Sequence, residues 1–335
     1  MRPGRLHRGW FVFAIGVAAL IVTLTVYFER GFVPGDAIVY LAAGERLNAG
    51  HQLYALMPGD RPVGLKPPYW TVPLLSPPLI GVVFRPLAAL PGDLGAYLWW
   101  MLTMAAIAAS VLLLAARRPG LTGTALLVLG IPLTYEIGVG NVNGLLLLGA
   151  IGAWWLTRQD RDGAAGGLVG LMIALKLTPA VLALWLLVER RWWALGAAIA
   201  AVLAAVVVTS LGAGFQANLD YLGVIRQTNV TGSSDLSLAG MARFVGLSAD
   251  LARWLPAVAL LLCLATMTAL RGRPGASFSV AIAAWVVGSP VDNINTFALL
   301  LAALAPAAWP TIATNAEALH RLGRASPGLS RPSGG

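Results

Sequence analysis

The chain has 335 residues, of which 58% are hydrophobic and only 11% are charged, and its mean hydropathy is +0.77. The formal net charge of +9 does not indicate nucleic-acid binding, because the basic residues are scattered singly or in pairs between apolar runs. Charge-free runs such as Trp10–Phe28 and Leu94–Ala116 are long enough to cross a hydrocarbon core, which needs roughly 20 residues. We therefore predict an all-α, polytopic membrane protein, whose single cysteine, Cys263, excludes an intrachain disulfide.

The basic residues predict the topology, because cytoplasmic loops carry an excess of Lys and Arg. Arg2, Arg5 and Arg8 place the N-terminus in the cytoplasm, and the later arginine clusters share that side if the chain crosses the membrane ten times. The first run is read as a retained span, since Val22–Arg30 offers no small-residue cleavage site and the chain re-enters apolar segments repeatedly. We expect spans near residues 9–28, 93–116, 120–135, 143–157, 163–175, 177–189, 192–212, 253–270, 275–290 and 295–312, with both termini in the cytoplasm.

One further apolar segment, residues 73–90, is not counted as a span. A crossing there would move every later basic cluster to the outside, against the positive-inside bias. Its four prolines and its internal Arg85 favour a broken, interfacial helix that lies against or re-enters the outer leaflet. The expected architecture is therefore a bundle of about ten spans with interfacial extracytoplasmic helices.

This topology gathers the polar residues on the extracytoplasmic face. The cytoplasmic loops are short and basic, with no phosphate-cradling glycine loop and no metal-binding cluster, so no metal or other cofactor is predicted. Residues 1–312 are expected to form one membrane domain, and residues 313–335 a disordered cytoplasmic tail. The polar segments on the outer face are Asp36 to Tyr69, Tyr135 to Asn143, Lys176, the loop of about residues 212–252, and Ser289 to Asn293.

Several short motifs follow one another in a recognisable order between about residue 30 and residue 300. They are Gly35-Asp36 with Tyr40 and Ala43, Gly50 with Leu53-Tyr54, Lys66-Pro67-Pro68, Gly140-Asn141-Val142-Asn143, Ala174-Leu175-Lys176-Leu177-Thr178-Pro179 before Glu189-Arg190-Arg191-Trp192, and Ser289-Pro290. In this ordered set the chain resembles glycosyltransferase family 87, which contains the polyprenyl-phosphate-mannose-dependent α-mannosyltransferases of actinobacteria. The resemblance implies a class C glycosyltransferase fold, in which the first extracytoplasmic loop supplies an acidic base and a lipid-phosphate sugar is the donor.

The chain departs from the family pattern at two places. The family often has Asn-Gln-Ser-Leu in its large extracytoplasmic loop, where this chain has Asp235-Leu236-Ser237-Leu238. The family also has histidines after the late Ser-Pro, where this chain continues with Val291-Asp292-Asn293. The resemblance therefore leaves the acceptor unidentified.

Asp36 is the candidate catalytic residue. Transfer of a sugar from a polyprenyl phosphate needs a carboxylate that takes the proton of the attacking acceptor hydroxyl. The alternative is that Asp36, next to Gly35, only caps a helix that starts here, and both roles are compatible.

Lys176 is the candidate ligand of the donor phosphate. It interrupts an otherwise apolar stretch of the chain, a position that is costly unless the ammonium group meets an anion or water. A lipid phosphate would satisfy that need. The alternative is a lysine that extends along the apolar surface to the membrane interface.

The remaining candidates are polar residues of the same face that would contact substrate. Asn141 and Asn143 stand beside glycines, so a simple turn is the alternative for them, and a solvated loop residue is the alternative for His51. Surface exposure is the alternative for Lys66 and Arg243. The full set of predicted substrate-binding residues is Lys176, His51, Tyr54, Lys66, Glu136, Asn141, Asn143, Arg243, Asp292 and Asn293.

The sequence thus predicts an integral membrane hexosyltransferase of the plasma membrane, with its active site outside the cytoplasm. It would move a hexose, mannose in the family it resembles, from a polyprenyl-phosphate donor to a lipid-linked or glycan acceptor by inverting general-base catalysis. Its expected partners are these two substrates and membrane lipids, with no nucleic acid. Two alternatives remain: a secondary transporter, because a break at Lys176 to Pro179 also fits a midplane substrate site, and a non-catalytic lipid-binding protein.

Overall fold

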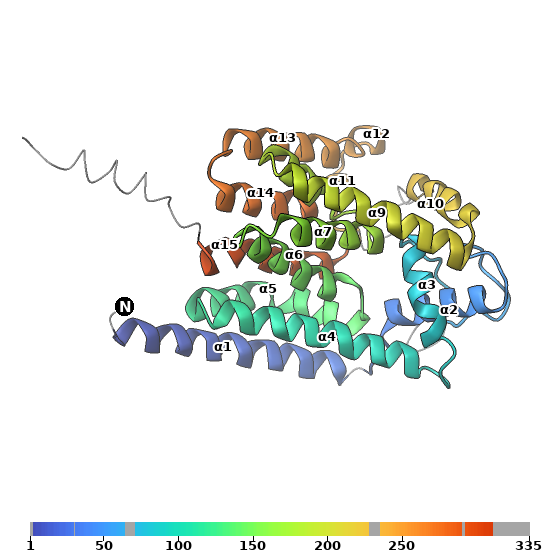
Figure 1. Cartoon of the computed structure of the whole chain (residues 1–335). Coiled ribbons are helices and arrows are strands. Elements are labelled where there is room, and N and C mark those ends of the chain that lie inside the picture. Colours follow the sequence, from blue (N-terminus) through green and yellow to red (C-terminus); the bar gives the residue numbers. More distant parts are fainter. Residues whose placement is uncertain (1–2, 30, 64–70, 228–234, 290–291, 311–335) are drawn as a thin grey trace, which may run out of the picture.

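The structure is a computed structural model that describes residues 3–29, 31–63, 71–227, 235–289 and 292–310. Every regular element in this part is a helix (Figure 1), as the composition predicted. The elements are α1 (Pro3–Phe28), α2 (Gly35–Asn48), α3 (Pro78–Leu87), α4 (Leu94–Ala115), α5 (Pro119–Val139), α6 (Asn143–Thr157), α7 (Asp162–Leu175), α8 (Ala180–Val188), α9 (Trp192–Ala213), α10 (Phe215–Gln227), α11 (Leu238–Phe244), α12 (Ala249–Ala252), α13 (Leu255–Ala269), α14 (Pro274–Val287), the 3₁₀ helix η1 (Ile294–Leu304) and α15 (Ala305–Ala308).

Five helical segments of the described chain are long and apolar enough to cross a membrane, which confirms a polytopic membrane helix bundle. The other expected spans are shorter: α8 has nine residues and is about 14 Å long, less than half of a hydrocarbon core of about 30 Å. The number of complete crossings and the side of each loop stay predictions. The five long segments are His7–Phe28, Leu94–Ala115, Pro119–Val139, Trp192–Ala213 and Ala249–Ala269.

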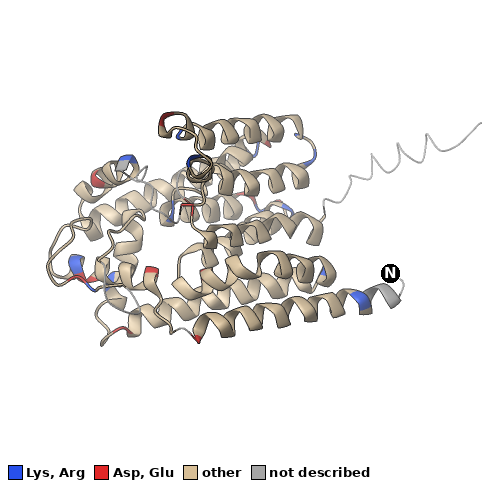
Figure 2. Ribbon diagram, turned by 180° about the vertical axis from the view of Figure 1, so that it is seen from behind, with Lys and Arg blue, Asp and Glu red and all other residues tan. Residues whose placement is uncertain are grey.

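The helices lie roughly side by side, and α2, α3 and α10 gather at one end of the bundle, far from the N-terminus (Figure 1). Charged residues lie mainly at the helix ends and in the connections, while the middle of the bundle is almost free of them (Figure 2). This distribution is what a bilayer imposes, because an unpaired charge at mid-depth is costly.

Helices α7 and α9 pack closely through glycine. A Cβ atom on Gly166 would lie 1.9 Å from the Ala194 carbonyl oxygen, and one on Gly170 would lie 2.3 Å from that of Ala198. Only a residue without a side chain allows the two backbones to approach in this way. Because α7 ends at Leu175 while α9 continues to Ala213, the turn after α7 lies beside the middle of α9 and not at its end.

Helix α2 is largely buried. Ten of its fourteen residues are buried, and it packs most extensively against α3. Gly44 is pressed against the backbone of Phe84, where a Cβ atom would come within 2.5 Å of the carbonyl oxygen. Helix α2, whose first turn carries Asp36, is thereby held against α3.

Ion pairs fix the connection that follows α2. Arg46 and Asp60 form an almost fully buried pair with an N–O distance of 2.8 Å, and Asp60 also accepts a hydrogen bond from the Met57 amide. Arg61 joins Glu45 on α2 to Asp93, which precedes α4. The part of this connection at residues 64–70, which includes Lys66, lies outside the described residues.

The topology makes a first prediction, that the segment around α3 does not cross the membrane. Helix α3 has ten residues and is about 15 Å long, so it is too short to span. In a Cys263→Ser background, cysteines at the exposed positions Gln52 and Pro91 should both react with a membrane-impermeant maleimide added outside the cell. A cysteine at Gln159, in a predicted cytoplasmic loop, is the matched control and should react only after permeabilisation. Labelling of positions 52 and 91 from opposite sides would overturn the ten-span topology.

Candidate active site

The candidate site is built around the break between α5 and α6. Helix α5 ends at Gly140, whose φ of 66° is in the left-handed region that favours glycine. Two tryptophans of α4 hold this break: Trp99 Nε1 donates to the Gly140 carbonyl at 3.2 Å, and Trp100 Nε1 donates to that of Ile137 at 2.6 Å. A Cβ atom on Gly140 would lie 3.3 Å from the Cβ atoms of Pro34 and Ala37. The break is thus pressed against the start of α2.

A chain of hydrogen bonds joins the predicted base to the predicted phosphate ligand across this break. Asn141 Nδ2 donates to Asp36 Oδ2 at 2.6 Å. Asn141 Oδ1 in turn accepts from the Asn143 amide at 3.0 Å, and Asn143 Oδ1 accepts from Lys176 Nζ at 2.9 Å. The side chains of Asp36, Asn141, Asn143 and Lys176 come from three helical boundaries that are far apart in the sequence, yet they belong to one network.

Glu136 holds this network in place by accepting hydrogen bonds. Its side chain sits on the last turn of α5, and the residue is only 1% exposed. Its carboxylate accepts three hydrogen bonds: from Asn143 Nδ2 at 3.0 Å, from the Gly144 amide at 3.2 Å, and from Asn295 Nδ2 at 2.8 Å. Because both oxygens are engaged, Glu136 positions Asn143 and the start of α6.

Asn295 is a member of the network that the sequence did not predict. It lies on η1, is 6% exposed, and donates a hydrogen bond to Glu136. An amide inside an apolar segment, where an unpaired polar group is costly, is the signal that could have identified it.

Lys176 lies just beyond the end of α7, in an extended backbone conformation. The following turn is held by Thr178, whose hydroxyl accepts from Trp285 Nε1 on α14 at 2.8 Å, and Pro179 precedes α8. Among the described residues, no carboxylate lies within ion-pair distance of the Lys176 ammonium group, although the charges of Glu136, Asp36 and Asp292 act on it. Its ammonium group therefore retains capacity for an anionic ligand.

Asp36 keeps partial solvent exposure at the start of α2. Burial raises its pKa above the ordinary value of 3.8, while the hydrogen bond from Asn141 and the positive charge of Lys176 lower it. The opposing effects are typical of a carboxylate that must be ionised to accept a proton and yet basic enough to hold it. The N-cap residue of α2 is Pro34, which makes no side-chain cap hydrogen bond, and Asp36 lies in the first turn of the helix.

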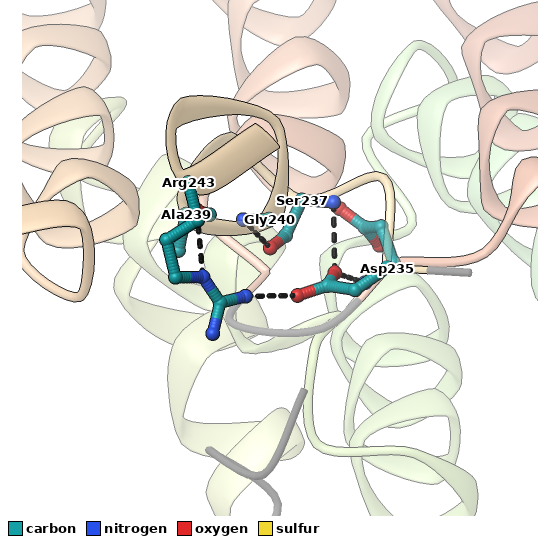
Figure 3. Close-up of polar contacts among 6 residues, drawn as sticks. Asp235, Ser237, Ala239, Gly240 and Arg243 are labelled. Atoms are coloured by element: carbon teal, nitrogen blue, oxygen red, sulfur yellow. Dashed lines mark hydrogen bonds and ion pairs between the residues drawn. The ribbon is translucent and has the colours of Figure 1, made fainter. Parts of the chain in front are cut away.

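A second polar cluster links α11 to the loop before η1 (Figure 3). The Asp235 carboxylate accepts from the Ser237 amide at 2.9 Å, from the Asp292 amide at 3.2 Å and from Arg243 Nη2 at 3.2 Å. The Leu236 amide donates to the Asp292 carbonyl at 2.6 Å. Arg243 is thus held in an ion pair with Asp235, and the cluster ties α11 to the loop that carries Asp292.

Asp292, on the same loop, is coupled electrostatically to Lys176. It is 2% exposed, and its Oδ1 atom has no hydrogen-bond partner among the described residues. Burial raises its pKa to about 7, with the Lys176 charge acting in the opposite direction. Asp292 is therefore a buried carboxyl group whose charge acts on Lys176.

The structure does not bring the other predicted ligands into the hydrogen-bond network of Asp36. His51 and Asn293 are exposed, and the Tyr54 hydroxyl donates to the Ser76 carbonyl at 2.9 Å. Lys66 lies outside the described residues. In the part of the chain that the structure describes, no three His, Cys, Asp or Glu side chains are grouped as metal ligands would be.

Comparison with known proteins places this site in a family. The model of glycosyltransferase family 87 matches residues 75–291. The chain is 30% identical over 247 residues to a polyprenol-phosphate-mannose-dependent α-(1-2)-phosphatidylinositol pentamannoside mannosyltransferase of Mycolicibacterium smegmatis, covering 69% of this chain and 57% of that protein. It is 33% identical over 196 residues to the protein of the same description from Mycobacterium tuberculosis, covering 54% of this chain and 42% of that protein.

The chain spans about half the length of these two curated relatives. No solved structure is significantly similar to it. The family match covers well over half of the chain and includes Glu136, Asn141, Asn143 and Lys176. On this ground the resemblance seen in the ordered motifs is confirmed, and the chain belongs to glycosyltransferase family 87.

Proposed function

We propose that the protein is a membrane mannosyltransferase that uses a polyprenyl-phosphate mannose donor and a lipid-linked glycan acceptor. Family membership supports the class of reaction, and the two relatives carry descriptions that name a polyprenol-phosphate-mannose donor and a mannosylated phosphatidylinositol acceptor. Both relatives come from mycobacteria, which supports a multi-pass protein of an actinobacterial plasma membrane with an extracytoplasmic site and cytoplasmic termini. The family also favours an enzyme over the transporter alternative.

The single observation that carries the proposal is the hydrogen-bond chain from Asp36 through Asn141 and Asn143 to Lys176. Asp36 lies before the segment matched by the family model, so its role rests on this geometry. A glycosyl transfer from a lipid phosphate needs a base on one side of the anomeric carbon and a cation for the leaving phosphate on the other. The Asn141–Asn143 turn supports both groups at once.

In the proposed reaction, the Asp36 carboxylate takes the proton of the acceptor hydroxyl as its oxygen forms a bond to the anomeric carbon of mannose. The bond from that carbon to the phosphate oxygen breaks, and the electron pair leaves with the polyprenyl phosphate. Lys176 offsets the negative charge that develops on the leaving phosphate. Attack and departure occur on opposite faces of the sugar, so the anomeric configuration inverts. Asn141 and Glu136 position the two groups and take no part in bond changes.

Replacement of the base gives the second prediction. Asp36→Asn keeps the size of the side chain and a polar group facing Asn141, so we expect a folded, membrane-inserted protein. Its amide cannot accept the acceptor proton, so mannosyl transfer should fall by about 10²-fold or more. Radiolabelled transfer from polyprenyl-phosphate mannose, with thermal unfolding measured in the same detergent, checks both parts. Transfer above about half of the wild-type rate, where loss of a base costs roughly 10²-fold, would show that Asp36 is not the base.

Lys176 gives the third prediction, which separates phosphate binding from a structural role. Lys176→Ala removes a charge-assisted hydrogen bond worth about 1.5–3 kcal/mol, so KM for the donor should rise by roughly ten- to a hundredfold. Lys176→Arg keeps the charge, so its KM for the donor should lie between that of the wild type and that of Lys176→Ala. Steady-state kinetics with the donor varied at saturating acceptor provide the measurement. An unchanged KM for the donor in Lys176→Ala would show that Lys176 has only a structural role.

Asn141 gives the fourth prediction, on pH dependence. Its amide donates to the ionised Asp36 and so lowers the pKa of that carboxyl. In Asn141→Ala the pKa of Asp36 should rise, and because the base works only when ionised, the acid limb of kcat/KM should move to higher pH. A hydrogen bond to a charged group is worth about 1.5–3 kcal/mol, which corresponds to a shift of about one to two pH units. An equal loss of activity at every pH would mean that Asn141 acts only through the shape of the turn.

A further inference from the structure

A cavity of about 1080 Å³ lies outside the hydrogen-bond network of Asp36, between the connection after α2 and helix α10. One wall is formed by Gln52, Tyr54 and the segment 73–75, and the other by the α10 face that carries Gln216, Asp220, Gly223 and Arg226. It belongs to the end of the bundle where α2, α3 and α10 meet (Figure 1). Nothing in the proposed donor site occupies this space.

The two walls are joined by an aromatic pair. The ring of Tyr54 stacks on that of Tyr221 of α10, with a centroid distance of 6.1 Å and an interplanar angle of 23°. The Tyr54 hydroxyl is fixed by its hydrogen bond to the Ser76 carbonyl. The cavity therefore has a rigid aromatic side, which favours the apolar faces of a ring-shaped ligand.

The polar groups that line the cavity define the chemistry of its ligand. They include two amides, the Asp220 carboxylate, which Gln216 Nε2 contacts at 2.8 Å, and the exposed guanidinium group of Arg226. The negative charge of Asp220 disfavours a phosphate group, and apolar side chains such as Leu74, Leu219 and Leu222 also line the cavity, which suits the C–H faces of sugar rings. Sugar hydroxyls both donate and accept, so they can bond to the carboxylate and to the guanidinium group together. The volume is slightly above the range of about 300–1,000 Å³ for ligand pockets, which allows more than one sugar ring.

The cavity wall is connected to the helix that carries Asp36. Ser76, whose carbonyl holds Tyr54, also has its side chain in contact with the hydroxyl of Tyr40. Tyr40 lies one helical turn after Asp36 on α2, and the charge of Asp36 acts on its hydroxyl. A glycan held in the cavity would therefore lie against the same structural unit that positions the base.

We propose that this cavity binds the glycan part of the acceptor, as a neutral chain of hexose rings. The proposal rests on the mannosyltransferase function and adds the place where the acceptor is held. Lys176 then serves the donor, and the Tyr54–α10 cavity serves the acceptor.

Gly223 offers a matched pair of variants that tests the cavity directly. It lines the cavity, and a Cβ atom added there would meet no other atom within 4 Å. Gly223→Ala should fold and bind as the wild type does, whereas Gly223→Trp should fill the cavity. The measurement is binding of mannotriose to the full-length protein in detergent, by saturation-transfer NMR without donor. Affinity for mannotriose should fall by about tenfold or more in Gly223→Trp.

Two further readouts complete the test. Arg226→Leu, on the exposed side of α10, should weaken mannotriose binding without changing the fold, and inorganic phosphate should not displace mannotriose. Displacement by phosphate, no binding by the wild type, or equal binding by Gly223→Trp would each overturn the proposal. Because binding is measured without donor, it is independent of transfer. If mannotriose binds as expected but no mannose is transferred to any acceptor, the proposed function fails and the glycan site stands.

Discussion

The arrangement of the site depends on one constraint, the need to satisfy a buried carboxylate in an apolar bundle. Glu136 is almost fully enclosed, and an unpaired charge or polar group at such a place costs several kcal/mol. Three donors from α6 and η1 meet that need. Glu136 accepts a hydrogen bond from the Asn143 amide group, which in turn accepts one from Lys176. The hydrogen bonds of Glu136 therefore hold α5, α6 and η1 together.

The backbone breaks place the reactive groups where the helices alone could not. Gly140 ends α5 and allows the close approach of α2, while the turn after Leu175 ends α7 beside the middle of α9. Asp36 and Lys176 are thus presented by helix ends whose neighbours are fixed, since Trp99, Trp100 and Trp285 all bond to these breaks. A site built in this way is preorganised, which is what a charge-developing transfer needs.

Much of this could be predicted from the sequence, because a bilayer restricts the chain to apolar helices and makes each internal charge conspicuous. The helical bundle followed from that, and the family followed from the ordered motifs. Asp36, Asn141, Asn143 and Lys176, which the sequence singled out, lie in one hydrogen-bond network. The burial of α2 could not be predicted, since it depends on Gly44 packing against α3, a contact between distant segments. The role of Asn295 and the pairing of Arg243 with Asp235 likewise required the three-dimensional contacts of η1 and α11.

The central claim is that the base and the phosphate ligand face each other across the Asn141–Asn143 turn. The most direct measurement is a cryo-electron microscopy structure of Asp36→Asn protein, trapped with polyprenyl-phosphate mannose. The account predicts a phosphate oxygen within hydrogen-bonding distance, about 2.7–3.2 Å, of Lys176 Nζ, with the anomeric carbon between that phosphate and residue 36. A donor phosphate bound away from Lys176, or a mannose ring turned away from residue 36, would contradict it.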